Sequence, residues 1–562
     1  MGEPGKIAYI RRFSNAKCDF RFFLSLKNKH DEKISREIIV AASVTESLAF
    51  LIDVIKKNVA ECLENNKENT QDDDKALLSG SQLSEDILVH FVRDSKFCRG
   101  DILIMEFINL TKNGYRTFLQ ILDDYYRVVA DAPLVRHLEL PSVILANYPV
   151  EPLKFHTSLC KKNYSKFNWY RSLDKEKWEL VGNSLQYSVK EEDVGYYLKL
   201  SCTLYGENNI KGPYVEVVSE YKVEKMIEFP VCPFETRHKL THNHLHGFSF
   251  RVVSYNILSD RYATRLQYNY CPLRALNIHY RKQLVMKELR GYNADIIALQ
   301  EVDNQHFTSY FKNEFNEMGF KSLYHRKGNC IPEGLLCAFN RRRYRLLESM
   351  HIVFKLELER RKVFAGAFGW LSQNAELIRE LKTQNTSLQV TVLCDNTTKD
   401  VIIVGNTHLY YHPDADHIRL LQSFMSTTIL NSIKSRLTRE YMNVGVVFCG
   451  DFNSNSEKSL YRFMIDGTID PKHRDCLTIS PTGHASIYHN FILESASGLP
   501  KYTNYTLDFK DCLDYIFVER NKFSVLRNVP VTGPEVLEQY AGLPNEFFPS
   551  DHLALVVDLQ TK

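Results

Sequence analysis

Apolar runs that break off at polar residues recur through the C-terminal half of this chain. IIALQ ends at Glu301, VIIVG is followed by His408, and VGVVFCG is followed by Asp451. Near-continuous apolar runs of this kind are typical of strands buried on both faces of a sheet. They alternate with helical patterns at residues 273–290 and 415–438, which predicts a mixed α/β domain built on packed sheets. We expect the polar residues at the strand ends to form one functional rim.

The N-terminal region shows a shorter pattern of strands around one helix. Apolar positions at Leu48, Leu51 and Ile55 recur at helical spacing. This arrangement is typical of a small α+β domain of the β-grasp type, which we expect over residues 1–136. The pattern predicts two strands, a helix and two strands, in that order, at residues 18–27, 37–44, 46–63, 87–92 and 101–108.

Residues 137–225 change to short strands separated by turn signals, which predicts a second β-rich domain. Trp169 lies on an early strand, Asp193 opens the sequence Asp-Val-Gly-Tyr, and Cys202 follows soon after that tyrosine. These features resemble the core of an immunoglobulin-like sandwich. Cys160 is too close to Trp169 to be the usual second cysteine of such a core.

A histidine-rich segment at residues 226–247 separates these domains from the C-terminal one. We interpret it as a solvated linker rather than a metal-binding tract, because histidines in such tracts need no fixed geometry. The domain with the buried strands then extends over residues 248–562.

Composition narrows the class of protein. The chain has 562 residues and a net charge of +3, so an anionic substrate must be bound by local charge rather than by a basic surface. Its 13 cysteines lack the paired spacing of zinc sites and several lie inside apolar runs, which predicts reduced core thiols. No run of about 18 uncharged apolar residues occurs, so we expect no membrane-spanning helix. The basic start of the chain fits a mitochondrial presequence and a surface strand equally well.

The polar residues at the predicted strand ends have the chemistry of a phosphodiesterase. Hydrolysis of a phosphodiester requires neutralised phosphoryl oxygens and an activated water, and Mg²⁺ held by a few carboxylates supplies both. Glu301 is the best candidate ligand, since a carboxylate after a fully apolar strand is costly to bury without a cation. A cap at the strand end is the alternative for Glu301. Asn256, after the strand RVVSY, would anchor either the metal's ligands or the Glu301 carboxylate.

Asp451 and Asn453 lie two residues apart after an apolar strand. In extended chain, residues i and i+2 point the same way, so we expect the carboxylate and the amide to converge. That pair suits an attacking water held by a base, with an amide donor aimed at the phosphate. A turn formed by Asp-Phe-Asn is the alternative. The neighbours Asp551 and His552 would place a metal or water ligand next to a phosphate donor.

Two further residues complete the predicted constellation. Asp514, at the head of an apolar strand, is suited to orient a histidine imidazole. His408 would donate to a non-bridging phosphoryl oxygen. Each residue alone is weak evidence, but their order on the strand ends of one domain favours a divalent-metal phosphodiesterase.

With these motifs the chain resembles the exonuclease–endonuclease–phosphatase superfamily, whose fold is a two-sheet α/β sandwich flanked by helices. The resemblance covers residues 248–562, after β-rich N-terminal domains, and rests on SYNILSDRYA, LQEVD, NTHLYYHP, CGDFNS and PSDHLAL. EGLLCAFNR and YTNYTLDFKDCLDYIFV resemble the deadenylase branch. Branch members built on leucine-rich repeats are excluded, because no such repeat precedes this domain.

The resemblance implies a role for each candidate residue. In it, Asn504 and Phe509 match the asparagine and the aromatic residue that face the nucleotide. The metal site is predicted to contain Glu301, Asp451, Asn453, Asn256 and Asp551, the catalytic residues are predicted to be Asp451, His552, Asp514 and His408, and the substrate-binding residues are predicted to be Asn504, Phe509 and Asn453.

The resemblance further implies a Mg²⁺-dependent 3′–5′ exoribonuclease or phosphodiesterase, with Mn²⁺ as a substitute metal. Its substrates would be 2′,5′-oligoadenylate and the 3′ poly(A) tails of RNA, with AMP released and no DNA or membrane partner. The implied location is the mitochondrial matrix, with the cytoplasm as the alternative.

Three other functions compete with this interpretation. A deadenylase of cytoplasmic mRNA shares the chemistry. A lipid or inositol phosphate phosphodiesterase of the same superfamily is disfavoured, since the Asn504 amide and the Phe509 ring suit ribose contact and base stacking. A non-catalytic RNA-binding scaffold is disfavoured because every candidate position keeps a competent side chain.

Overall fold

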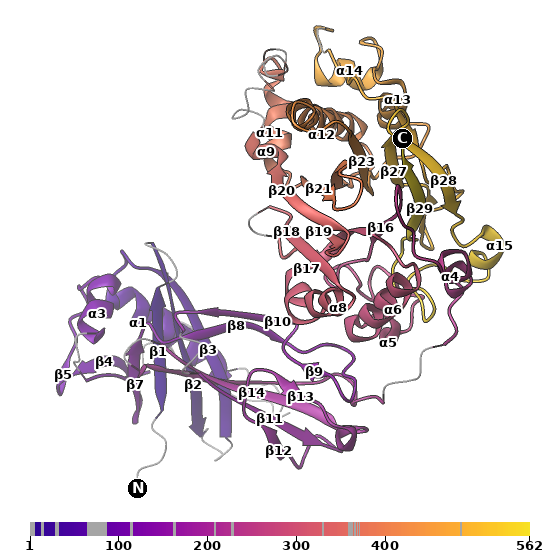
Figure 1. The fold of residues 1–562 in the computed structure, drawn as a ribbon. Helices are drawn as coiled ribbons and strands as arrows, with labels where there is room; N and C mark the ends of the chain where they lie inside the picture. Colours follow the sequence, from indigo (N-terminus) through magenta and orange to yellow (C-terminus); the bar gives the residue numbers. More distant parts are fainter. Residues whose placement is uncertain are drawn as a thin grey trace. The chain divides into compact units, whose positions relative to one another are not determined.

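The chain folds into two compact units, residues 1–226 and 227–562, in the computed structural model (Figure 1). Among the described residues, none of the helices is both long and apolar enough to cross a membrane. The structure describes residues 6–562 except residues 13–15, 28–32, 65–86, 113–115, 161–164, 207–208, 226–229, 329–330, 358–363, 365–366, 368, 370 and 484–485.

The first unit begins with a seven-stranded sheet in the order β3-β2-β1-β7-β6-β4-β5. β1 is parallel to β7, and the other neighbouring strands are antiparallel. One face of the sheet packs on helices α1 and α3 through a core that includes Phe20, Phe22, Leu51 and Phe107. The elements are β1 (Ile7–Arg12), β2 (Lys17–Lys27), β3 (Lys33–Ser43), α1 (Leu48–Glu64), β4 (Val89–Arg93), β5 (Lys96–Phe97), α3 (Ile104–Lys112), β6 (Thr117–Ile121) and β7 (Asp124–Ala130).

The predicted strand at residues 101–108 is wrong, because helix α3 occupies this part of the chain. Ile104, Phe107 and Ile108 are the buried residues of the helix, and their spacing follows one helical face. An apolar run this short does not distinguish a strand from a buried helix by its pattern alone. Strands β1, β5, β6 and β7 have no counterpart in the predicted order.

The first unit continues with a four-stranded sheet in the order β12-β11-β14-β15. Trp169 on β11 is fully buried and stacks on Tyr187, with the ring centroids 6.0 Å apart. The Tyr187 hydroxyl donates to buried Asp193 at 2.7 Å. Cys202 is a free thiol, so the immunoglobulin-like interpretation stays a prediction that rests on these core residues. The elements are β8 (Leu134–Glu139), β9 (Pro149–Val150), β10 (Lys154–Ser158), β11 (Lys166–Ser172), β12 (Glu179–Gly182), β13 (Tyr187–Ser188), η2 (Glu191–Asp193), β14 (Tyr197–Tyr205) and β15 (Lys211–Val218).

The second unit is built on two six-stranded sheets, which confirms the predicted two-sheet α/β sandwich (Figure 1). The first sheet has the order β18-β19-β17-β16-β29-β28 and the second has the order β20-β21-β22-β23-β27-β24. The strands are β16 (Ser249–Asn256), β17 (Ile296–Asp303), β18 (Phe320–Arg326), β19 (Glu333–Asn340), β20 (Tyr344–Val353), β21 (Ser387–Asp395), β22 (Val401–His408), β23 (Val444–Asp451), β24 (Leu493–Ser495), β27 (Asp514–Glu519), β28 (Phe523–Val529) and β29 (Leu555–Thr561).

Helices cover the outer faces of both sheets. Val252, Ile296, Val404 and Val447 belong to the core between the sheets. Helices α6 (Ile278–Gly291) and α8 (Lys312–Glu317) pack on the first sheet, and α11 (Ala375–Thr383), α12 (Asp416–Leu437) and α13 (Ser459–Asp466) pack on the second. The helix predicted at 415–438 is therefore confirmed. The one predicted at 273–290 is divided into α5 (Leu273–Leu276) and α6 by Asn277, whose side chain caps α6 by accepting from the His279 amide at 2.7 Å.

The prediction of a solvated linker at residues 226–247 is wrong for residues 235–241, whereas His242, His244 and His246 beyond them are exposed, as predicted. Helix α4 (Glu235–Thr241) forms there and packs on the second unit. The buried Arg237 guanidinium donates to the carbonyls of Pro530 and Ala554, at 2.9 and 2.8 Å. His238 lies 3.1 Å from the Glu288 carbonyl. The sequence of this helix shows no apolar face, because its buried residues are Arg237 and Thr241, with Phe234 packed on Phe548 at its N-terminus.

Candidate active site

Strand pairing in the second sheet brings the predicted catalytic residues into one row. β22 and β23 are parallel, with His408 opposite Asp451, and β23 pairs with β27 so that Asp451 is opposite Asp514. His552 approaches from the loop before β29, where it forms a bridge with Asn504. The row explains why these apolar strands end in polar residues.

Asn256 joins the two sheets. Its side-chain nitrogen donates to Glu301 and to Asp451, at 3.0 Å in each case. Its side-chain oxygen accepts the Leu258 amide at 3.1 Å. Because the nitrogen rather than the oxygen faces the carboxylates, this geometry supports the anchoring alternative for Asn256 over direct metal ligation.

Glu301 is turned into the site by an irregularity in β17. The register with β19 shifts between Leu299 and Val302, and Glu301 adopts a positive φ of 58°. One carboxylate oxygen of Glu301 accepts the Ser259 amide at 2.9 Å. Burial, followed by the charges of Glu333 and Asp551, raises the pKa of Glu301 to about 7. A bulge of this kind re-aims a side chain beside an active site, at a cost in backbone strain.

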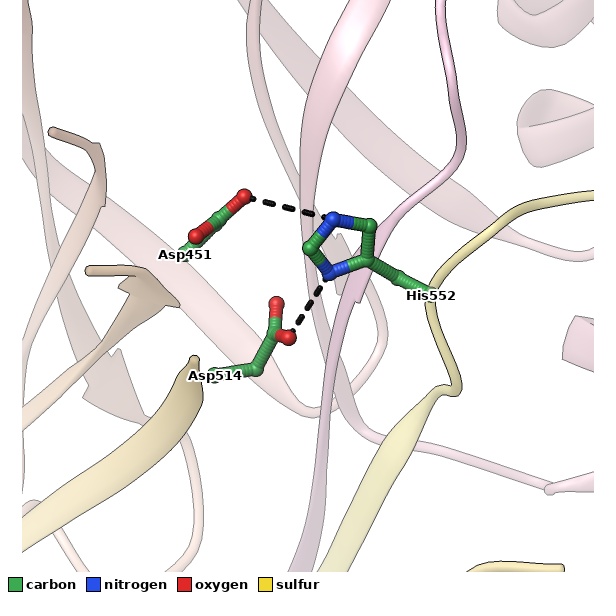
Figure 2. Close-up of side chains that lie close together, drawn as sticks. All are labelled: Asp451, Asp514 and His552. Atoms are coloured by element: carbon green, nitrogen blue, oxygen red, sulfur yellow. Dashed lines mark hydrogen bonds and ion pairs between the residues drawn. The ribbon is translucent and has the colours of Figure 1, made fainter. Parts of the chain in front are cut away.

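His552 forms a buried acid–base unit with two aspartates, as Figure 2 shows. Its Nδ1 lies 2.8 Å from Asp514, and its Nε2 lies 3.6 Å from Asp451. Burial lowers the pKa of His552, but Asp514, Asp451 and Asp551 outweigh burial and hold the pKa well above its ordinary value. The ring is therefore an imidazolium, and Asp514 lies where it orients the ring, the role that the sequence predicts for it. Burial raises the pKa of Asp451 to about 6, against the lowering effect of His552.

His408 lies between the two carboxylates that Asn256 joins. Its Nδ1 is 3.9 Å from Glu301, and its Nε2 is 3.5 Å from Asp451. Burial, together with Lys327 and His552, holds the pKa of His408 well below its ordinary value. His408 is therefore neutral where His552 is charged, so the two imidazoles differ in the protons they can offer.

The extended-chain argument for Asp451 and Asn453 is wrong. β23 ends at Asp451, and Asn453 adopts a positive φ of 50°, so the two side chains do not follow strand alternation. The backbone amide of Asn453 donates to Asp451 at 2.9 Å, and its side-chain nitrogen donates to the Leu409 carbonyl at 3.0 Å. Among the described residues, one side-chain N–H and the side-chain oxygen of Asn453 have no partner and remain for a ligand.

Phe509 is presented on a short hairpin formed by β25 (Asn504–Tyr505) and β26 (Lys510–Asp511). Phe509 is 49% exposed, but its backbone is fixed by Thr506. The Thr506 amide and hydroxyl donate to the Phe509 carbonyl, and the Phe509 amide donates to the Thr506 hydroxyl. At the base of the hairpin, Asn504 donates to Asp551 at 3.3 Å. An exposed ring on a fixed turn has the form of a stacking surface.

Three residues of the site have no counterpart in the sequence prediction. The Tyr268 hydroxyl donates to Asp551 at 2.9 Å, so protein donors occupy the carboxylate that was expected to be a metal ligand. Lys327 places its ammonium 3.4 Å from His408 Nδ1 and 3.5 Å from Glu333. Glu333 is buried at the start of β19, within EGLLCAFNR, and an acid that opens an apolar strand is the one signal that identifies it.

The donors of this site fit a hard divalent cation. Within the described chain, Asp451, Asp514 and His552 offer ligand atoms that all lie within 4.8 Å of one another. His552 Nδ1 is already bonded to Asp514, so an ion at that place would have to break the pair. Glu301 and Asp451 are oxygen donors, and burial raises the pKa of each. A divalent cation bound between them would offset the cost of burying their charges.

The fold and this site define a hydrolase of the phosphodiesterase type. The sequence pattern of the endonuclease/exonuclease/phosphatase family matches residues 253–552. This chain belongs to that family, as the sequence motifs predict.

Known relatives carry phosphodiesterase and exoribonuclease names. The chain is 34% identical to 2′,5′-phosphodiesterase 12 of Rattus norvegicus and also to that of Homo sapiens, in each case over 79% of this chain and 76% of the relative. It is 28% identical to the CCR4-Not complex 3′-5′-exoribonuclease subunit Ccr4 of Schizosaccharomyces pombe, over 56% of this chain and 50% of that protein. The 79% share exceeds the length of the second unit, so the phosphodiesterase relatives also match part of the first.

Proposed function

We propose that this protein is a Mg²⁺-dependent phosphodiesterase that hydrolyses 2′,5′-oligoadenylate and 3′ poly(A) tails of RNA and releases AMP. The observation that carries the proposal is the pair of buried carboxylates, Glu301 and Asp451, joined by one amide of Asn256. The relatives named 2′,5′-phosphodiesterase 12 support the 2′,5′ linkage. The related 3′-5′-exoribonuclease subunit supports attack at the 3′ end of an RNA.

Glu301 and Asp451 would hold the metal, and Mn²⁺ would occupy the same oxygen ligands. A bound Mg²⁺ supplies positive charge at the phosphoryl oxygens and makes a bound water more acidic. The partly buried ammonium of Lys327, 3.4 Å from His408, adds a further positive charge on the same side of the site.

The chain's own residues would move the protons of the hydrolysis. Asp451 takes a proton from the attacking water, whose oxygen bonds to phosphorus as the bond to the leaving ribose oxygen breaks, and a solvent water gives that oxygen its proton. His552, charged and held by Asp514 at 2.8 Å, donates from Nε2 to a phosphoryl oxygen as charge develops there. His408 is neutral and donates one N–H to a non-bridging oxygen.

The hairpin at residues 504–511 would select the substrate. Phe509 stacks on the terminal adenine, and Asn504, beside Asp551, contacts the adjoining sugar or phosphate. A deadenylase of cytoplasmic mRNA would use the same hairpin. The mitochondrial location stays a prediction from the sequence resemblance.

Hydrolysis of a matched substrate panel tests the proposal. We expect AMP from 2′,5′-triadenylate and from 3′,5′-oligoadenylate in Mg²⁺, none with a chelator, and no phosphate or headgroup release from a phosphoinositide. Release from the phosphoinositide alone would replace the proposal with the lipid phosphodiesterase alternative.

A further inference from the structure

The seven-stranded sheet of the first unit has one face that neither α1 nor α3 covers. We call it the outer face. It carries Phe23, Ile39 and Tyr125, which are 58%, 48% and 52% exposed, whereas the alternating residues of the same strands are buried against the helices. Large aromatic side chains on an open sheet face are a liability in water unless they contact a ligand.

Arginines lie between these apolar side chains. Arg21 on β2 pairs with Ile39 on one side and with Tyr9 on the other, and it is two residues from Phe23 on the same face. Arg127 follows Tyr125 on β7 with the same two-residue spacing. The outer face therefore alternates rings with guanidinium groups along β2 and β7, and Glu37, opposite Phe23 on β3, is a carboxylate on the same face.

A cavity of about 360 Å³ lies where the outer face meets β8, and Asp19, Arg21, Leu134, Val135 and Arg136 line it. The volume is at the lower end of small-ligand pockets, which span roughly 300–1,000 Å³. Two guanidinium groups against one carboxylate leave the lining positive.

Asp19 orients Arg21 at the cavity and also binds the buried Arg11. It accepts from Arg21 Nε at 2.8 Å and from Arg11 Nε at 3.1 Å. Because Arg21 is held through Nε, its terminal nitrogens have no partner among the described residues and keep their donors for a ligand. Arg11 does not line the cavity and its Nη1 is buried, so the donors that face a ligand there are those of Arg21. A guanidinium that is held in place and still has free N–H donors is well suited to bind phosphate.

We propose that the outer face and its cavity bind single-stranded RNA. Bases stack on Phe23 and Tyr125, and phosphates bind Arg21, Arg127 and Arg136, which combines a ring platform with a positive groove in the way that sequence-tolerant single-strand sites do. The proposal rests on the proposed function for the choice of RNA, since a tail-shortening enzyme gains affinity when a second site holds the chain upstream of the cleaved end. Protein–protein interfaces also contain aromatic rings and arginines, but they do not require guanidinium groups with free donors at a cavity of nucleotide size.

Binding of adenylate chains of two lengths tests this site in the full-length protein. With Glu301→Gln and chelator present to prevent cleavage, affinities for a 3-mer and a 20-mer are measured by fluorescence anisotropy across a salt series. Arg21→Ala with Arg136→Ala should weaken 20-mer binding about tenfold and reduce the log–log salt slope by roughly 1.4, the value for two lost single-strand phosphate contacts. Phe23→Ser, a surface change outside the arginine network, should weaken the 20-mer without changing the salt slope.

The matched control is Arg99→Ala, which removes an exposed guanidinium of the same unit that pairs with Asp101 and lies off the outer face. The proposal is overturned if the arginine variants bind the 20-mer no more weakly than the Arg99→Ala control does, or if they lose as much affinity for the 3-mer as for the 20-mer. A changed oligomeric state with unchanged RNA affinity would also overturn it, in favour of a protein interface. Turnover of 2′,5′-triadenylate by the same variants with Glu301 restored should stay at the wild-type rate. If wild-type protein hydrolyses no adenylate, the proposed function fails, while 20-mer binding still reports on the outer face.

Discussion

Metal-free protein should lose stability as the pH rises through the range in which the buried carboxylates ionise. The pKa of Glu301 is raised from its ordinary value to about 7 by burial and by Glu333 and Asp551, and burial raises that of Asp451 to about 6. In the unfolded chain both groups titrate near pH 4. A pKa raised on folding gives stability that is fully present below the unfolded pKa and is lost as the pH rises through the folded pKa.

The size of this loss follows from the shift. A rise from 4.5 to about 7 for Glu301 corresponds to about 3 kcal/mol of folding free energy between acid and neutral pH. A bound Mg²⁺ compensates the ionised carboxylates, so the stabilisation by Mg²⁺ should grow over the same pH range. At about 2 °C per kcal/mol for a large domain, the difference in Tm between Mg²⁺ and chelator should widen by roughly 6 °C from pH 5 to pH 8.

Thermal unfolding at a series of pH values, with Mg²⁺ and with EDTA, measures this difference. Glu301→Gln and Asp451→Asn replace each carboxylate by a neutral group of the same shape, so each should reduce both the pH-dependent loss and the Mg²⁺ effect. Glu457→Gln changes an exposed carboxylate of the same unit and should behave as wild type. A Mg²⁺ effect that is equal at pH 5 and pH 8, or that survives undiminished in Glu301→Gln, would refute the reasoning.

Three substitutions test the roles of single residues. Asp451→Asn should lower kcat by orders of magnitude while substrate binding persists or tightens; parallel loss of binding in a titration would make Asp451 a structural turn residue. Asp514→Asn removes the anion 2.8 Å from His552 and lowers its pKa, so the alkaline limb of the pH–rate profile should move to lower pH; a uniform loss at every pH contradicts this. Phe509→Ala should reduce oligoadenylate kcat/KM by roughly ten- to a hundredfold, the value of a lost base stack, and leave a small chromogenic phosphodiester almost unaffected. Equal losses on both substrates would mean that Phe509 only packs the hairpin.

The sequence predicts the sandwich well because its strands are almost continuously apolar. β17, β22 and β23 are buried at every position, and each carries a functional residue at its end. Parallel and antiparallel pairing then aligns His408, Asp451 and Asp514 without further information. The apolar pattern fails at α3, where a short run fits a helix and a strand equally well.

Contacts between distant residues lie beyond the sequence pattern. Asn256 on the first sheet donates to Asp451 on the second, and Tyr268 donates to Asp551, 283 residues further along the chain. Lys327 is one of several lysines with no local feature to separate it from a solvated side chain. These residues are recognised only when packing brings them together, because no local periodicity records such a contact.

The central claim is that Glu301 and Asp451 form a metal-dependent site that cleaves adenylate chains. The most direct test is AMP release from 2′,5′-triadenylate by wild-type protein and by Glu301→Ala, in Mg²⁺ and in EDTA, with folding of the variant verified by circular dichroism. Loss of several kcal/mol of transition-state stabilisation at about 1.4 kcal/mol per factor of ten predicts a fall of roughly a hundredfold or more in the folded variant, and no AMP in EDTA for either protein. A folded Glu301→Ala protein that keeps more than about a tenth of wild-type turnover would contradict the claim.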